Sequence, residues 1–218
     1  MLQKKQKGFT LVEIAIVLVI VGLLIGGVLK GQEMITNAKL KRIESDNAGL
    51  GAAIFGYQDR YLQLPGDDDG AAARFDAYKG LDGDNDGAIE GAWNPVIKAG
   101  DAGVTDTSDD ETARFWGQLR ASGLVAGDPL DFSPQANAYA GKIGVQYGAL
   151  GIGGHVTVFG ALEGSVVKVI ESRLDDNNGS TGRVRAQIVS SPAVVILAAQ
   201  GGAATYADLS LYDLVFRF

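Results

Sequence analysis

The sequence predicts an α+β fold in which a long N-terminal helix, apolar in its first half and amphipathic in its second, packs on a globular domain with an antiparallel sheet. Three observations predict it. A mostly apolar run covers residues 9–29, apolar residues at helical spacing continue from Leu40 to Tyr61, and strand-like runs occupy much of the last third of the chain. With 218 residues, the chain has room for one domain of about 150 residues beyond a membrane helix.

The composition excludes several classes of function. The chain has no cysteine, which excludes disulfides, thiol nucleophiles and thiolate metal sites together. Its net charge is −7, and because an acidic surface repels phosphates, direct nucleic acid binding is not expected. Glycine is frequent, with 31 residues and no repeat period, which indicates turns and loops and not a collagen-like chain.

The first element is a membrane-spanning helix. Residues 9–29 are enough to cross about 30 Å of hydrocarbon. Lys4, Lys5 and Lys7 precede the run, and the positive-inside tendency therefore places the N-terminus in the cytoplasm and the body of the chain beyond the membrane. A cleaved secretory signal is the alternative, but LKGQEMITN, which follows the run, has no pair of small residues for a cleavage site.

One acid, Glu13, lies in the apolar run, about one turn after its beginning. A carboxylate in hydrocarbon is costly, although less so near the boundary, where it can reach water. The residues by themselves allow two explanations. Glu13 is either a passive acid at the membrane interface or an acid with a cationic partner inside the membrane.

The segment KGFTLVE (residues 7–13) resembles the processing site of type IV prepilins and type II secretion pseudopilins. Those proteins have a short basic leader, a glycine, a phenylalanine, and a helix whose fifth mature residue is glutamate, and each of these is present here at the same spacing. The resemblance implies that a prepilin peptidase cleaves between Gly8 and Phe9 and that Phe9 is N-methylated. It also implies that Glu13 pairs with the Phe9 α-amine of a neighbouring subunit, because a buried carboxylate and a buried amine offset each other's cost.

The same resemblance implies a pilin-like fold in four parts. They are a leader (1–8), a transmembrane assembly helix (9–31), the amphipathic half of that helix (32–64) and a globular domain (65–218) with an acidic loop insert (66–111). The implied function is a structural, non-enzymatic subunit of a type IV pilus or type II secretion pseudopilus. Its partners would be other pilin or pseudopilin subunits and the inner-membrane assembly machinery. The subunit would cross the inner membrane of a Gram-negative bacterium once, with its globular domain in the periplasm, and then enter the filament.

The helix is predicted to continue beyond the membrane. Apolar residues recur in steps of three and four, with polar Asn47 at the one position that breaks the stripe. The stripe consists of Leu40, Ile43, Leu50, Ile54, Tyr57 and Tyr61. Pro65 and Gly66 end the pattern. Residues 9–62 are therefore predicted to form one helix of about 80 Å, whose second half packs on the chain's own domain.

Acids dominate residues 66–111, and the stretch DGDNDGAIE (82–90) resembles the first half of a calcium loop. The candidate ligands are Asp82, Asp84, Asp86 and Glu90. The three aspartates alternate and a glycine follows them, which lets their oxygens converge on one centre. Position 12, normally a bidentate glutamate, is Trp93, so a complete EF-hand is absent. Some type II secretion pseudopilins bind calcium in their globular domain. A Ca²⁺ site and a solvated acidic turn are both open interpretations.

Two shorter helices and five strands complete the predicted domain. Ser108 and Glu111 have the spacing of a capping box, and Phe115, Trp116 and Leu119 then share one face before Gly123. A second helical stripe consists of Leu162, Val166, Val169, Ile170 and Leu174, and it leads into an acidic turn at 175–179. The strand-like runs are 142–150, 155–161, 184–189, 193–197 and 209–218.

Enzyme chemistry has little support in the sequence. The single histidine, His155, lies in no recognisable nucleophile pattern, and no glycine-rich phosphate loop opens a helix. Many pilins carry proline at mature residue 22, where this chain has Lys30, which favours a minor pilin or pseudopilin over a major pilin. The competing function is a single-pass, membrane-anchored binding protein, such as an adhesin or substrate-recognition module. That protein would work with an uncleavable Gly8, whereas a filament subunit needs its processed amine.

Overall fold

The computed structural model describes residues 9–75, 82–95, 111–176, 178–189 and 205–218. The chain divides into two compact units, one ending at Lys41 and the other extending from Arg42 to Phe218. Each unit is described by itself below.

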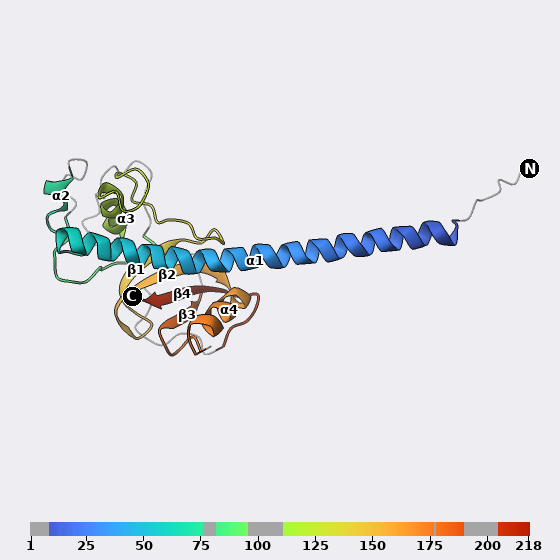
Figure 1. Cartoon of the computed structure of the whole chain (residues 1–218). Helices are drawn as coiled ribbons and strands as arrows, with labels where there is room; N and C mark the ends of the chain where they lie inside the picture. The colour runs from blue at the N-terminus through green and yellow to red at the C-terminus, as the bar shows by residue number, and fades with distance from the viewer. Residues whose placement is uncertain (1–8, 76–81, 96–110, 177, 190–204) are drawn as a thin grey trace, which may run out of the picture. The chain divides into compact units, whose positions relative to one another are not determined.

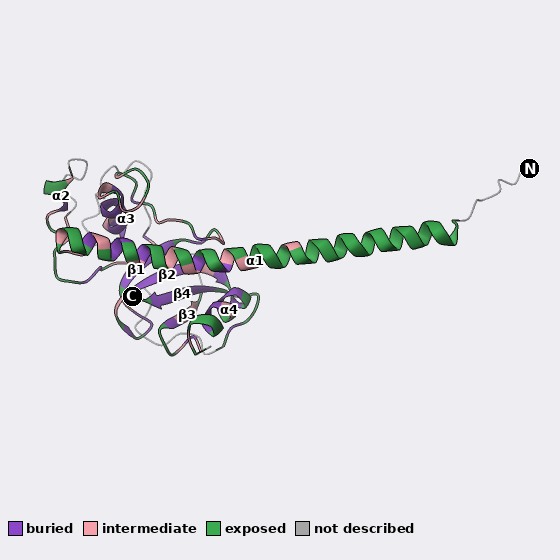
Figure 2. Cartoon of the chain, in the orientation of Figure 1, coloured by how far each residue is buried: buried purple, intermediate pink, exposed green. Residues whose placement is uncertain are grey.

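Helix α1, Leu11–Tyr61, is continuous over 51 residues and runs through both units (Figure 1). The predicted helix over residues 9–62 is therefore confirmed to within two residues at either end. The large apolar side chains from Phe9 to Ile35 are exposed along the helix, as the green ribbon shows (Figure 2). Their mean hydropathy reaches 2.8 in an 18-residue window, and α1 is long and apolar enough to cross a membrane.

The second half of α1 belongs to the unit that begins at Arg42, and it buries its predicted stripe there. Ile43, Leu50, Ile54 and Tyr57 are all buried. Asn47, the polar residue that breaks the stripe, accepts a hydrogen bond from the hydroxyl of Thr157. The interruption in the pattern is thus a polar contact between the helix and the sheet.

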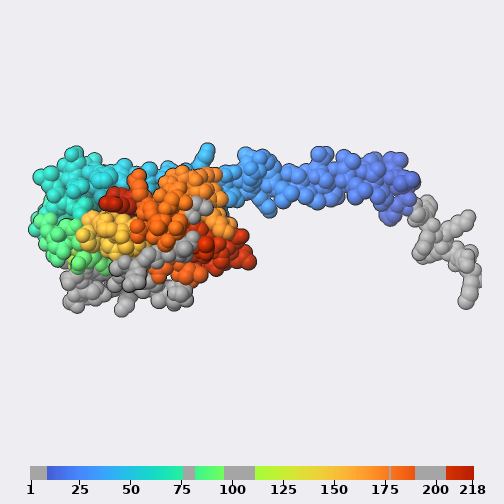
Figure 3. Space-filling view, turned by 90° about the horizontal axis from the view of Figure 1, so that it is seen from below, coloured from blue at the N-terminus to red at the C-terminus, as the bar shows by residue number. Residues whose placement is uncertain are grey.

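The domain contains a four-stranded antiparallel sheet in the order β1-β2-β4-β3 (Figure 1). Its strands are β1 Ile143–Ala149, β2 Ile152–Glu163, β3 Val184–Ile188 and β4 Leu211–Arg217. Four predicted strands are confirmed, while the predicted strand at 193–197 lies outside the described residues. In the space-filling view the yellow and orange segments, which carry β1 and β2, lie beside red atoms of the C-terminal segment (Figure 3).

Helix α4, Gly164–Leu174, follows β2 and packs against β2, β3 and β4. The sequence predicts that the apolar stripe of this helix begins at Leu162, and the prediction is wrong for that residue. Leu162 belongs to β2, where it is paired with Tyr212 of β4. Strand β2 extends past Leu162 because this side chain is fully buried when it is part of the sheet.

Two further helices flank the acidic segment. Helix α2, Ala71–Arg74, is a single turn, and α3, Glu111–Ala121, buries Phe115, Trp116 and Leu119 as predicted. Ser108 of the predicted capping box lies outside the described residues. Gly123 follows α3 with a φ of 71°, a conformation that glycine adopts freely at the end of a helix.

Residues 89–93 lie against β1, and the side chain of Trp93 also reaches β2. The backbone N–H of Tyr147 donates to the carbonyl of Ile89, and Trp93 packs so closely on Gly144 and Gly160 that neither position has room for a Cβ. Trp93, which holds position 12 of the predicted calcium loop, is 3% exposed and belongs to the core. These contacts fix the acidic loop against the sheet.

Candidate functional site

The start of α1 is closed by a capping box formed by Thr10 and Glu13. The Thr10 hydroxyl oxygen accepts a hydrogen bond from the Glu13 backbone N–H at 3.2 Å. The Glu13 carboxylate accepts from the Thr10 backbone N–H at 2.8 Å and from its hydroxyl at 2.9 Å. Because the first backbone N–H groups of a helix have no partner within the helix, this reciprocal pair determines where α1 begins.

The structure therefore places one predicted site residue, Glu13, in a role that the sequence prediction had missed. Thr10 is the missed partner, although its spacing to Glu13 is the T-x-x-E pattern that marks a capping box. Phe9 is exposed and directly precedes Thr10, whereas Gly8 lies outside the described residues. Both hydrogen bonds from Thr10 end on Oε2 of Glu13, so the carboxylate has a second oxygen with which to accept from another donor.

A second site is built from the acidic loop and an aspartate that precedes it. Carboxylate oxygens of Asp67, Asp84 and Asp86 lie within 4.8 Å of one another, and such a group could hold a metal ion. Asp67 is 1% exposed, while the other two aspartates are exposed. The pKa of Asp67 is raised, first by burial and further by the negative charges of Asp86 and Asp84.

The loop is folded around carboxylates from outside it. The two oxygens of Asp67 accept from the backbone N–H groups of Asp86 and Gly87, both at 3.0 Å. Glu111, the first residue of α3, accepts from the backbone N–H groups of Asp84 at 3.1 Å and Glu90 at 3.3 Å. The glycine after the third acid, Gly87, has a φ of 88°, which is the sharp turn expected from the sequence.

Glu111 adds a fourth carboxylate to this region. It is almost fully buried, and burial, helped by the charges of Asp67 and Asp84, raises its pKa to about 7 despite the two amide donors. Two carboxylates at this loop, Asp67 and Glu111, are thus withdrawn from water, and the pKa of each is raised in part by the neighbouring acids. Such an arrangement attracts a cation, since the repulsion between the carboxylates falls when one binds.

Two of the four predicted calcium ligands belong to the cluster with Asp67, and the other two do not. Asp84 and Asp86 belong to the cluster. The carboxylate of Asp82 instead accepts from the backbone N–H of Ala72 at 2.8 Å, and Glu90 is exposed. Neither Asp67 nor Glu111 could be found from the loop pattern, because one precedes the loop and the other follows it by about twenty residues.

The acidic turn after α4 is organised by its own backbone. Asp175 accepts from the N–H groups of Arg183 and Val184, and Asp176 accepts from the N–H of Asn178 and the hydroxyl of Thr181. These bonds agree with the acidic turn that the sequence predicts here. Together with Glu171, the two aspartates also form a group whose oxygens lie close enough to hold a metal ion.

His155 holds the acidic loop against strand β2. Its Nε2 accepts a hydrogen bond from the backbone N–H of Ile89 at 3.1 Å, and its ring contacts those of Tyr147 and Phe218. Burial lowers the pKa of His155, so the neutral imidazole that can accept this bond is favoured. The histidine fastens the loop to β2.

Comparison with known proteins places the start of the chain in a recognised class. No curated protein matches the chain. Residues 3–29 match the family model of the prokaryotic N-terminal methylation motif, so the chain carries the signature of type IV pilins and pseudopilins.

Proposed function

We propose that this protein is a minor pilin or pseudopilin, a structural subunit of a type IV pilus or type II secretion pseudopilus. The motif at residues 3–29 carries this proposal, since it supports a type IV pilin-like or pseudopilin subunit in general. Proteins with this motif are structural and not enzymatic. The absence of the usual proline at Lys30 favours a minor subunit.

In the proposed maturation, a prepilin peptidase cleaves between Gly8 and Phe9 and leaves a methylated α-amine at Phe9. The amine then lies one residue before the capping box, close to the start of the membrane-spanning segment. Glu13 accepts from its own Thr10 through one oxygen and from the amine of a neighbouring subunit through the other. Burying either charge by itself is costly, so the pair favours the register in which the two meet.

The proposed location follows from the exposed apolar half of α1. This segment anchors the unassembled subunit in the inner membrane, and the domain that begins at Arg42 lies in the periplasm. Other subunits and the inner-membrane assembly machinery then bury the same apolar surface in the filament. Direct contact with nucleic acid is not part of the proposal, because the chain is acidic.

The intact mass of the native protein tests this function. The protein is recovered separately from sheared surface filaments and from membranes. A mass that begins at methylated Phe9, present in the filament fraction, supports a pilus subunit. The same mass in membranes alone supports a pseudopilin or a minor subunit that initiates the filament. A mass that begins at Met1 in both fractions contradicts processing, and the membrane-anchored binding protein would then be preferred.

The acidic loop supports a second part of the proposal, a Ca²⁺ site held by Asp67, Asp84 and Asp86. The donor set consists of carboxylate oxygens alone, which suits a hard cation, and the nitrogen and sulfur ligands that favour transition metals are missing from it. The bound ion would neutralise the cluster and tie the loop to the segment before α2. The sequence pattern also predicts Asp82 and Glu90 as ligands. Variants of these residues therefore test which carboxylates bind the ion.

Calcium should raise the melting temperature of the purified domain. At a free concentration of about 100 times Kd, binding adds about 2.7 kcal/mol of stability and raises Tm by roughly 5–10 °C. Scanning calorimetry with calcium and with a chelator measures the difference. Asp84→Asn should abolish the response, whereas Glu90→Gln, the matched control, should keep it. An unchanged response in Asp84→Asn, or no response in the unaltered protein, would contradict the proposed site.

A further inference from the structure

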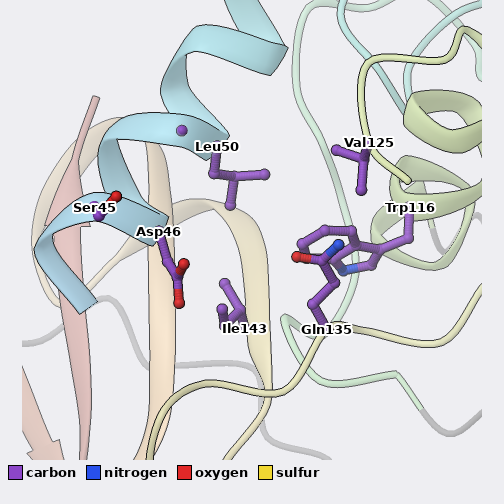
Figure 4. Close-up of a pocket in the computed structure, with 8 residues that line it drawn as sticks. Ser45, Asp46, Leu50, Trp116, Val125, Gln135 and Ile143 are labelled. Atoms are coloured by element: carbon purple, nitrogen blue, oxygen red, sulfur yellow. The ribbon is translucent and has the colours of Figure 1, made fainter. Parts of the chain in front are cut away.

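A pocket of about 160 Å³ beside the second half of α1 is lined by side chains that already have partners (Figure 4). Its Asp46 is paired with Arg42 at 3.5 Å, and the guanidinium of Arg120 lies 5.7 Å from the ring centroid of its Trp116. The turn that follows α4 is different. It places the reactive side-chain amide of Asn178 beside a backbone N–H that donates to no acceptor in the described part of the chain.

That N–H belongs to Gly179, and Asn178 is the one asparagine of the sequence that precedes a glycine. An asparagine side chain reacts when the backbone nitrogen of the next residue attacks its Cγ, and a Cβ on that residue would obstruct the attack, which glycine does not have. Gly179 is buried, and its carbonyl accepts from the N–H of Ala186 at 3.1 Å. A buried N–H without an acceptor is rare. No hydrogen bond to a described residue therefore holds this nitrogen away from the side chain.

The side-chain carbonyl of Asn178 accepts two hydrogen bonds from Ser180. The backbone N–H of Ser180 donates to Oδ1 at 3.1 Å, and its hydroxyl donates to the same oxygen at 2.7 Å. The first bond folds the side chain of Asn178 back over the backbone of Gly179, toward the nitrogen that attacks. Both bonds draw electron density from Cγ and stabilise the negative charge that develops on Oδ1 during the attack. Ser180 therefore both positions and activates the amide.

Two more hydrogen bonds keep the turn in this shape. The backbone N–H of Asn178 donates to the carboxylate of Asp176 at 3.0 Å, and the backbone N–H of Thr181 donates to the carbonyl of Asn178 at 2.9 Å. A fixed arrangement lowers the entropy that the attack costs. Asn178 and Ser180 are half-buried, so water reaches their side chains.

We propose that Asn178 is a site of spontaneous deamidation in the folded protein, activated by Ser180. The nitrogen of Gly179 forms a bond to Cγ of Asn178 and gives its proton to water. The bond from Cγ to Nδ2 breaks, and this nitrogen takes a proton and leaves as ammonia. Water then adds to either carbonyl carbon of the resulting cyclic imide and opens it to aspartate or isoaspartate. The inference is independent of the proposed filament function.

The modification changes the outer edge of the sheet, because this turn covers the edge of β3. Strand β3 is at one end of the strand order, and two of its N–H groups donate to the turn. Val184 donates to the carboxylate of Asp175, and Ala186 donates to the carbonyl of Gly179. Isoaspartate adds one carbon to the backbone just before Gly179 and so displaces this carbonyl. The N–H of Ala186 then becomes available to water or to another strand.

Ageing of the purified full-length protein tests the inference. Peptide mass spectrometry measures deamidation at every asparagine over time, in the native protein and in the same protein unfolded in urea. In the native protein, Asn178 should react at least about tenfold faster than any other asparagine, and within about tenfold of its own rate in urea. A native rate below either limit would overturn the inference.

Two variants separate the activation by Ser180 from the reactivity of the Asn-Gly pair itself. Ser180→Ala removes the hydroxyl that donates to Oδ1 and should slow the native reaction about fivefold. Thr181→Val is the matched control, because the Thr181 hydroxyl donates to Asp176 and to the backbone carbonyl of Asn178 but not to the side-chain amide. It should change the native rate by less than about twofold. In urea both variants should react like the unaltered chain. Equal native rates in Ser180→Ala and the unaltered chain would overturn the inference.

Hydrogen exchange at Ala186 tests the effect on the sheet edge. Asn178→Gln keeps an amide, but its longer side chain closes a larger ring and reacts slowly, so this variant ages without the modification. After ageing, the Ala186 amide should exchange at least about tenfold faster in the unaltered chain than in Asn178→Gln. Equal exchange in the two aged proteins would overturn the effect on the edge.

Discussion

Glu13→Ala should reduce incorporation into filaments by about a hundredfold or more, because leaving one member of a buried ion pair without its partner costs roughly 3–5 kcal/mol and about 1.4 kcal/mol is a factor of ten. Leader cleavage after Gly8 should stay at the wild-type level, since the variant keeps the glycine and phenylalanine of the processing site. Immunoblots of sheared filaments measure the first effect, and the intact mass of the membrane fraction measures the second.

The capping box makes a sharper control possible, because it gives Glu13 a structural role that is independent of any neighbour. Glutamine also serves at the third helical position of a capping box, so Glu13→Gln keeps an acceptor for Thr10 and removes only the charge. If the carboxylate pairs with an amine, Glu13→Gln should fail to assemble much as alanine does. If Glu13→Gln assembles normally, the residue acts by capping α1 and the proposed ion pair is wrong.

Asp68→Ala should destabilise the domain by about 3 kcal/mol and lower Tm by roughly 6–12 °C, since it leaves several buried donors without an acceptor. Asp68 is fully buried, accepts from the hydroxyl of Tyr57 at 2.5 Å and from the backbone N–H of Gly70, and forms an ion pair with Arg74. Burial and the nearby carboxylate raise the pKa of Tyr57, so its phenol stays protonated and donates. Urea and thermal unfolding of the purified domain measure the effect.

Asp69→Ala is the control for this variant. Asp69 is the next residue along the chain but is exposed, and its carboxylate accepts from the side chain of Gln63. Its removal should change the stability by less than about 0.5 kcal/mol. Asp68→Ala should also weaken any response to calcium, because Asp67 loses the anchor beside it. Equal stability of the two variants would show that the Asp68 network does not hold this segment.

The parts of the fold that the sequence predicted are those determined by local pattern. The stripe on the second half of α1 and the face of α3 each follow from helical spacing, and both are buried as expected except for Tyr61, which is half-buried. Leu162 shows the limit of that argument. Its spacing suits the helix that follows, but pairing with Tyr212 on a distant strand places it in β2. Strand pairing depends on contacts far apart in the sequence, which a local pattern does not contain.

The candidate site likewise contains some residues that a local pattern predicts and others that only the fold brings together. Asp84 and Asp86 were predicted from their alternation, since adjacent positions in one loop readily converge. Asp67 and Glu111 come from segments before and after the loop, and their carboxylates meet it because the chain folds back between α1 and α3. Thr10 is a different case. Its spacing to Glu13 is the T-x-x-E pattern, so the capping box is predictable from the sequence alone.

The bond between Asn47 and Thr157 has a mechanical consequence. Asn47 lies on the helix that the proposed filament would hold, and Thr157 lies on β2, an inner strand with a neighbour on either side. Arg173 of α4 and Glu44 of α1, 3.6 Å apart, add a second attachment on the same helix. Tension along α1 would therefore enter the domain at the middle of the sheet and spread to the strands on both sides. If the proposed filament is pulled, a domain loaded in this way resists peeling from an edge.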